Sequence, residues 1–413
     1  MRNEILNNID NPKELEKLYR ENKVSFKKEF NAIYPEMQHK NLQFWYERLH
    51  FGSEQQSSDG KKEIGIVVIL ALVAGLLVNI PNITGIDKEI FLTRNLSFII
   101  FPVLIVYFIW KQKLEFKQWA GVCIAVVIAV FYMNLLPQNN ASSSINLSLI
   151  HTPIFLWAVF GYAFLGEKNK NLEYRIKFLR YNGDLIIMSG ILLLSTFLFS
   201  AITMGLFQLI DIQIEKFYTQ YILIWLLAAI PIMANYFIQN NAQLINRVSP
   251  IIAKIFTPLV CINLFIYVLT MIITKKFPYQ DRNLLLLFNV LLIGVMALIL
   301  FTIAETASSP KSKFNLVMLF ILSILTIIVN GIALYAISFR INEYGISPNR
   351  IAVLGSNLLI FINLLKVAYQ LYSSIFKNEV VEAIEDSIAR YLPIYGIWAG
   401  IVAFIIPILF QFK

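Results

Sequence analysis

Long, uninterrupted stretches of apolar residues recur along this chain and constrain its fold more than any other feature. A helix needs roughly 20 apolar residues to cross the hydrocarbon core of a bilayer. The candidate stretches lie at about 64–82, 96–112, 119–137, 147–165, 185–209, 217–238, 250–274, 283–304, 314–339, 349–374 and 391–411. Because a helix satisfies its own backbone hydrogen bonds, these stretches predict an all-α, polytopic membrane helix bundle of about 11 transmembrane helices.

The composition excludes the soluble alternatives. Apolar residues make up 57% of the 413 residues and charged residues 15%, against roughly a quarter in an average soluble domain. The two cysteines, Cys123 and Cys261, lie inside apolar stretches, where we expect inert, buried side chains. The sequence contains no CxxC and no HExxH pattern, so we predict no metal and no cofactor.

Residues 1–62 differ from the rest of the chain because they are polar, and they predict a soluble helical segment before a transmembrane domain at 63–413. Pro12 suits the first position of a helix, and Glu16 and Arg20 are spaced as an i,i+4 ion pair. Residues 52–60 have the composition of a linker. The segment is either a small cytosolic cap or a module that binds a cytosolic protein partner.

The distribution of charge predicts the orientation. Residues 1–63 contain equal numbers of basic and acidic side chains, so the formal charge of +9 belongs to the remainder. Lysine and arginine are frequent at 111–117 and 168–180 and absent from the intervening loop, which predicts a cytoplasmic N-terminus and anionic lipid headgroups as partners. We expect no nucleic-acid partner, because no basic cluster is interleaved with aromatic residues outside the apolar stretches.

Two segments between the apolar stretches have the pattern of helices that lie on the membrane surface. Near 167–181, Leu172, Ile176 and Leu179 share one side of a helix that is otherwise basic. Near 375–391, apolar residues recur every four positions while acidic residues point elsewhere. Both segments predict interfacial amphipathic helices that anchor the protein.

Polar side chains within apolar helices are costly and therefore informative. Lys366 lies on the order of 12 Å from the nearer end of its predicted helix, at 1.5 Å per residue. One face of this helix contains Asn349, Ser356, Asn363, Lys366 and Gln370, and the preceding helix offers Ser323, Thr326 and Asn330. The short loop between them predicts antiparallel neighbours. The two polar stripes either form interhelical hydrogen bonds or line an interior cleft.

The loop at 340–350 joins these two helices and suggests a second polar site. Gly345 suits the left-handed end of one helix, and Ser347 with Pro348 suits the start of the next. Arg340 and Arg350 flank Glu343, so one arginine can pair with the carboxylate. The loop is either a structural Arg–Glu clasp or a site where Arg350 and free backbone N–H groups recruit an anion.

The stretch ALYAISFRINEYGISPNR resembles the signature of the bacterial membrane proteins grouped as domain of unknown function 4153. The N-terminal NPKELEKLYRENK and FWYERL are also similar to segments that precede the membrane domain in members from Bacteroidetes. The resemblance implies a multi-pass protein of the bacterial inner membrane and implies no activity. Its motif positions here are Arg340, Glu343, Tyr344, Gly345, Asn349 and Arg350.

Three functions are consistent with these patterns. The first is transport or handling of an anionic small molecule or lipid. The second is a non-catalytic sensor or scaffold that acts through residues 1–62. The third is a membrane-embedded transferase, against which the lack of an acid–base constellation counts; we predict no catalytic residues. The predicted ligand-binding residues are Arg340, Glu343, Tyr344, Asn349, Arg350, Asn330, Asn363 and Lys366.

Overall fold

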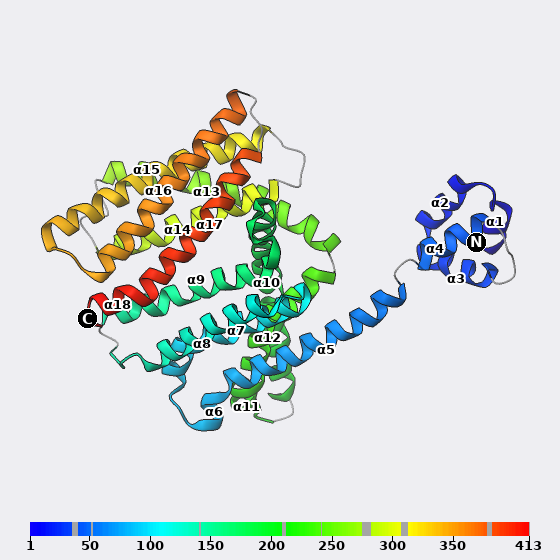
Figure 1. Ribbon diagram of the computed structural model, residues 1–413, viewed down its shortest axis with the longest axis horizontal. Coiled ribbons are helices and arrows are strands. Elements are labelled where there is room, and N and C mark those ends of the chain that lie inside the picture. Colours follow the sequence, from blue (N-terminus) through cyan, green and yellow to red (C-terminus); the bar gives the residue numbers. More distant parts are fainter. Residues whose placement is uncertain are drawn as a thin grey trace. The chain divides into compact units, whose positions relative to one another are not determined.

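The computed structural model describes residues 1–34, 40–50, 53–139, 142–208, 212–240, 242–274, 282–306, 313–377 and 382–412 (Figure 1). The chain divides into two compact units, the N-terminal unit Met1–Ile66 and the membrane unit Val67–Lys413. The boundary falls within helix α5 (Ser53–Val78). The described residues are 92% helical and contain no β-strand, as the sequence predicts.

The N-terminal unit contains the four helices α1 (Arg2–Asn7), α2 (Pro12–Glu21), α3 (Lys23–Ile33) and α4 (Lys40–His50) and the first turns of α5. Asn11 caps α2 by accepting a hydrogen bond from the backbone N–H of Glu14, and Pro12 is the first helical residue, as predicted. The core of the unit consists of Ile5, Leu15, Phe26, Phe30, Ile33, Leu42 and Trp45. Since about 60 residues bury little apolar surface, aromatic packing supplies much of this small core.

A carboxylate ties two helices of the N-terminal unit together. Glu16 on α2 accepts from Arg20 Nε at 2.8 Å, the predicted i,i+4 pair, and contacts Arg48 Nη2 on α4 at 2.7 Å. The hydrogen bond from Arg20 and the charges of both arginines hold the pKa of Glu16 below its usual value. Because the folded pKa is lowered, the contribution of this carboxylate to stability is present at neutral pH and is lost as the pH falls through the folded value.

Ten helices within the described ranges are long and apolar enough to cross a membrane, so the chain is a multi-pass helical membrane protein. They are built on α7 (Lys88–Gln112), α8 (Phe116–Leu135), α9 (Ser143–Leu165), α10 (Leu172–Gln208), α12 (Ile224–Asn240), α13 (Ala242–Thr274), α14 (Arg282–Thr306), α15 (Lys313–Tyr344), α16 (Pro348–Phe376) and α17 (Glu382–Gly400). Shorter segments are α6 (Ile80–Thr84), a 3₁₀ turn at Gly166–Lys170, α11 (Glu215–Phe217), π-helical turns at Tyr218–Leu223 and Ile401–Ile405, and α18 (Ile406–Leu409).

Ten candidate spans within the described residues agree with the prediction of about 11. The first predicted span, 64–82, is not among them. Its helix α5 ends at Val78, and the charged residues Lys61, Lys62 and Glu63 precede the apolar part, which leaves an apolar stretch shorter than a bilayer core. A buried Asn79 then begins the separate short helix α6, with its side chain donating to the carbonyl of Gly75 at 2.9 Å.

The two segments predicted as surface helices are parts of longer helices. The segment near 167–181 is largely the first part of the long helix α10, and the segment near 375–391 contains the end of α16 and the first turns of α17. Their apolar side chains Ile176, Leu179, Ile384 and Ile388 are buried in the protein core. The amphipathic pattern therefore arises from packing between helices, which produces the same periodicity as packing on lipid.

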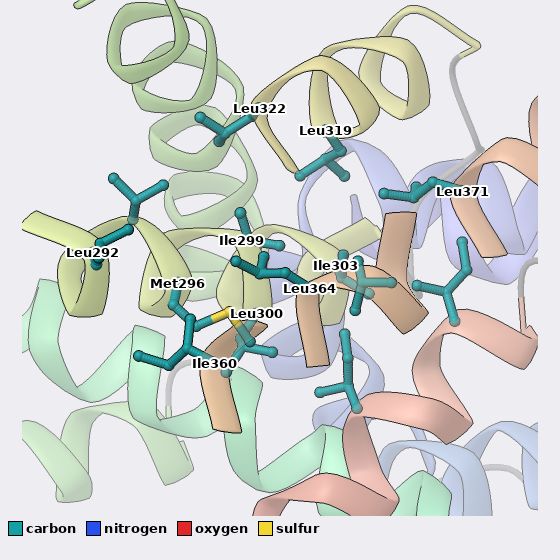
Figure 2. Packing of buried hydrophobic residues seen from close by; sticks show 14 of the residues in the cluster. Leu292, Met296, Ile299, Leu300, Ile303, Leu319, Leu322, Ile360, Leu364 and Leu371 are labelled. Carbon is teal, nitrogen blue, oxygen red and sulfur yellow. The ribbon is translucent and has the colours of Figure 1, made fainter. Parts of the chain in front are cut away.

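A large core of the membrane unit joins α10, α13, α14, α15, α16 and α17 (Figure 2). Helices α15 and α16 form a long hairpin of antiparallel neighbours, as predicted (Figure 1). Helix α17 packs against α16 on one side and against α9 and α10 on the other. Helix α17 therefore contacts the α15–α16 hairpin through α16. It also contacts α9, which in turn packs against α7 and α8.

Candidate functional site

The predicted capping of the loop between α15 and α16 is confirmed. Gly345 has a φ of +75°, in the left-handed region that favours glycine at the end of a helix. Ser347 is the N-cap of α16, where its hydroxyl accepts from the backbone N–H of Arg350 at 3.4 Å, and Pro348 is the first helical residue. The loop is therefore a defined turn whose geometry follows from its sequence.

Arg350 closes this turn through the backbone, not through Glu343. Its Nη1 donates to the carbonyl oxygens of Tyr344 at 2.8 Å and Gly345 at 2.7 Å, which are otherwise free at the end of α15. Within the described loop no ion pair joins Glu343 to Arg340 or Arg350. The Arg–Glu clasp expected from the sequence is replaced by an Arg–carbonyl clasp.

The remaining loop residues predicted as a ligand site surround one exposed ring. The guanidinium carbons of Arg340 and Arg350 lie 6.0 and 5.5 Å from the centroid of the Tyr344 ring. Tyr344 and Glu343 are exposed, and Asn349 is half-buried in the first turn of α16. The structure thus brings Arg340, Tyr344 and Arg350 together, with the guanidinium of Arg350 already donating to two carbonyls.

The polar stripes of α15 and α16 form hydrogen bonds between helices. Asn330 Nδ2 donates to the carbonyl of Asn357 at 3.1 Å, and Asn357 Nδ2 donates to Asn289 Oδ1 on α14 at 2.8 Å. Asn363 Nδ2 donates to the hydroxyl of Tyr395 on α17 at 2.8 Å. All are buried. Of the two readings of the stripes, interhelical hydrogen bonding is the one that these contacts support.

Lys366 is not inside a cleft. Its side chain is exposed, and its Nζ lies 5.3 Å from the ring centroid of Tyr391 on α17, within cation–π distance. The depth of Lys366 along the helix follows from the sequence, but the side on which it projects depends on how α17 packs. The exposed side chain gives no support to the alternative of an interior cleft at Lys366.

A groove of about 690 Å³ lies between α9 and α17, away from the predicted site. Such a volume is within the roughly 300–1,000 Å³ range of small-molecule sites. Its lining consists of Phe155, Trp157, Ala158, Val159, Gly161, Tyr162 and Leu165 of α9, Asn169 after it, Arg175 and Phe178 of α10, Leu392, Pro393, Gly396, Ile397 and Gly400 of α17, and Ile401 and Ile405 of the following π-helical turn. Its lining is almost entirely apolar.

Small residues bring the two helices of the groove together. A Cβ on Gly396 would lie 2.6 Å from the Cβ of Ala158, and one on Gly400 would lie 3.4 Å from the Phe155 ring. Ser148 on α9 also donates to the carbonyl of Ala403 in the π-helical turn at 2.6 Å. These contacts show that α9 and α17 are antiparallel, and they anchor the helices along the groove.

Arg175 is the only charged side chain among the described residues that line the groove. Its Nε donates to the carbonyl of Asn169 at 2.9 Å and its Nη1 to the carbonyl of Ala389 at 3.1 Å. These bonds fix the guanidinium beside the first turns of α17 and use two of its five N–H donors. The arrangement is an apolar groove with a positioned cation at one end.

Three other cations that lie close to Arg175 along the chain have partners. Lys177 pairs with Glu173 at 2.7 Å, and Lys168 Nζ lies 4.5 Å from the ring centroid of Tyr174. Arg180 pairs with the buried Glu305 on α14, with 3.1 Å between Nε and Oε1. From the sequence, Arg175 is one of five similar basic residues between 168 and 180, so it was missed as a site residue.

No family model, no curated protein and no solved structure matches this chain. The resemblance to domain of unknown function 4153 therefore stays a prediction.

Proposed function

We propose that this membrane protein handles an anionic lipid, with an acyl chain in the α9–α17 groove and the anionic headgroup at Arg175. The observation that carries the proposal is the combination of an apolar groove of about 690 Å³ with a single fixed cation at its end. An amphiphile has the same division into an apolar chain and a charged group. A neutral apolar ligand would offer no hydrogen-bond acceptor to the remaining N–H donors of Arg175.

The chemistry of arginine favours a phosphate headgroup. A guanidinium presents parallel N–H groups that bind phosphate oxygens in a bidentate manner. Two donors of Arg175 hold it to backbone carbonyls, which reduces the entropy lost on binding, and three are left for the ligand. The density of lysine and arginine between residues 168 and 180 predicts that this end of the groove faces the cytoplasmic leaflet of a bacterial inner membrane.

The test is lipid retention measured by native mass spectrometry. The purified protein is exchanged into equal amounts of phosphatidylglycerol and phosphatidylcholine, as wild type, Arg175→Gln and Lys177→Gln. We expect wild type to prefer phosphatidylglycerol and Arg175→Gln to bind it about tenfold more weakly, the effect of losing one charge-assisted contact. Lys177→Gln is the matched control, because it removes a nearby positive charge outside the groove lining.

Two measurements separate binding from folding. Thermal unfolding in detergent shows whether Arg175→Gln remains folded, and Arg175→Lys keeps the charge while it loses the bidentate geometry. Equal retention of both lipids by wild type, or undiminished phosphatidylglycerol retention by a folded Arg175→Gln, would overturn the proposal.

A further inference from the structure

The N-terminal unit contains a second concave site that is independent of the groove. A depression of about 410 Å³ lies between the end of α2, the exposed face of α3 and the end of α4. It is lined by Tyr19, Lys23, Lys27, Lys28, Asn31, Arg48 and Leu49. Four of these side chains are cationic and none is acidic.

The three lysines are the uncompensated charges of this site. Arg48 contacts the carboxylate of Glu16 at 2.7 Å, so its charge is balanced within the unit. Among the described residues no ion pair involves Lys23, Lys27 or Lys28. Since residues 1–63 carry no net charge, the excess of positive charge at this depression reflects how the fold arranges the side chains.

Two features intensify the positive potential there. Lys23 and Lys27 are one helical turn apart on α3, and such a like-charge pair destabilises a helix in the absence of a counter-charge. Lys23 is also in the first turn of α3, which contains no acidic side chain, so its charge adds to the positive end of the helix dipole. A bound anion would relieve both.

An aromatic ring lies beside two of the four cations of the depression. Lys23 Nζ and the guanidinium carbon of Arg48 lie 5.6 and 5.5 Å from the centroid of the Tyr19 ring. The ring itself packs edge-on against Phe26 and Trp45 of the core. The charged wall is therefore attached to the rigid part of the unit, which reduces the cost of ordering it around a ligand.

We propose that this depression binds a phosphate-bearing anion. A phosphate group has several acceptor oxygens and up to two charges, so it can be shared by three lysines, whereas one carboxylate neutralises only one of them. The volume fits a small phosphorylated ligand or the headgroup of an acidic lipid. The shared chemistry is phosphate, and the probe decides between the two sources.

The experiment uses the full chain in nanodiscs of phosphatidylcholine, titrated calorimetrically at low salt with inorganic pyrophosphate and, separately, with short-chain phosphatidic acid. We expect saturable binding that the double variant Lys23→Gln/Lys27→Gln weakens about tenfold and that added salt also weakens. The matched control is Lys13→Gln/Lys17→Gln, an exposed i,i+4 lysine pair on α2 outside the depression.

Each outcome decides the proposal. Tighter binding of pyrophosphate identifies a soluble phosphorylated ligand, and tighter binding of phosphatidic acid identifies a lipid headgroup; either supports the site. Because phosphatidic acid can also enter the α9–α17 groove, its binding is measured in Arg175→Gln as well. Absence of saturable binding of either probe, or equal losses in both lysine variants, would overturn it.

Discussion

The α15–α16 hairpin and the α9–α17 pair are both antiparallel helix pairs of the membrane unit, and they use polar residues in opposite ways. In the hairpin, amides bond to neighbouring helices and Arg350 bonds to the carbonyls of its own turn. In the α9–α17 pair, glycine and alanine make the contact, and Arg175 keeps unused donors beside an apolar groove. A polar ligand site requires both an open space and hydrogen-bonding groups that have no partner within the protein. A polar residue in an apolar helix does not by itself indicate either of the two.

The largest expected effect comes from Arg180, a second arginine on α10, which unlike Arg175 pairs with a buried carboxylate. Arg180→Met leaves the buried carboxylate of Glu305 without its arginine, which should lower the free energy of unfolding by about 3 kcal/mol. Arg175→Gln loses only two hydrogen bonds to carbonyls and should cost about 1 kcal/mol. Denaturant unfolding in detergent measures both.

The double variant Arg180→Met/Glu305→Gln is the control for this comparison. It removes the uncompensated charge and should recover part of the lost stability. An Arg180→Met protein as stable as Arg175→Gln would show that the Arg180–Glu305 pair is not a structural ion pair.

Filling the groove should weaken lipid retention without unfolding the protein. Val159 is half-buried in the groove lining, so Val159→Trp places a large side chain in the space proposed for the acyl chain. We expect phosphatidylglycerol retention to fall about tenfold, equivalent to about 1.4 kcal/mol. Leu358→Trp, at an exposed position of the hairpin, is the control. Equal retention by the two variants would place the lipid elsewhere.

The sequence predicted the architecture well because long apolar helices follow from local composition. The turn from Gly345 to Pro348 was also predictable, since caps depend on residues close together in the chain. Features that depend on tertiary packing do not follow from the sequence in this way. The same amphipathic period fits a helix on lipid and a helix in a core, and Ile176 and Ile388 lie in the core.

The candidate site could not be predicted for the same reason. Lys366 is conspicuous in the sequence because it is deep in an apolar stretch, yet it projects outward over Tyr391. Arg175 is inconspicuous because it lies among other basic residues. Only the approach of α17, whose Ala389 carbonyl accepts from its guanidinium, distinguishes it from Lys177.

A smaller effect is expected from the amide network of the hairpin. Asn357→Leu removes the hydrogen bond to Asn289 Oδ1 and should lower the free energy of unfolding by about 1 kcal/mol, since interhelical hydrogen bonds in membranes contribute little each. A double-mutant cycle with Asn289→Leu isolates the pair. Phosphatidylglycerol retention should stay at the wild-type level. A loss of retention in Asn357→Leu would indicate that the amides line a ligand cleft after all.

The smallest effect is expected at the loop, where the comparison is most direct because each region has an arginine that donates to two backbone carbonyls. Arg350→Ala releases the carbonyls of Tyr344 and Gly345, which water can reach at this exposed turn, so the free energy of unfolding should fall by about 0.5 kcal/mol. Lipid retention should be unchanged, in contrast to Arg175→Gln. The opposite pattern, with retention lost in Arg350→Ala and kept in Arg175→Gln, would favour the anion site predicted at the loop. Both arginines donate to two backbone carbonyls, so the difference between the two variants isolates the contribution of the apolar space beside Arg175.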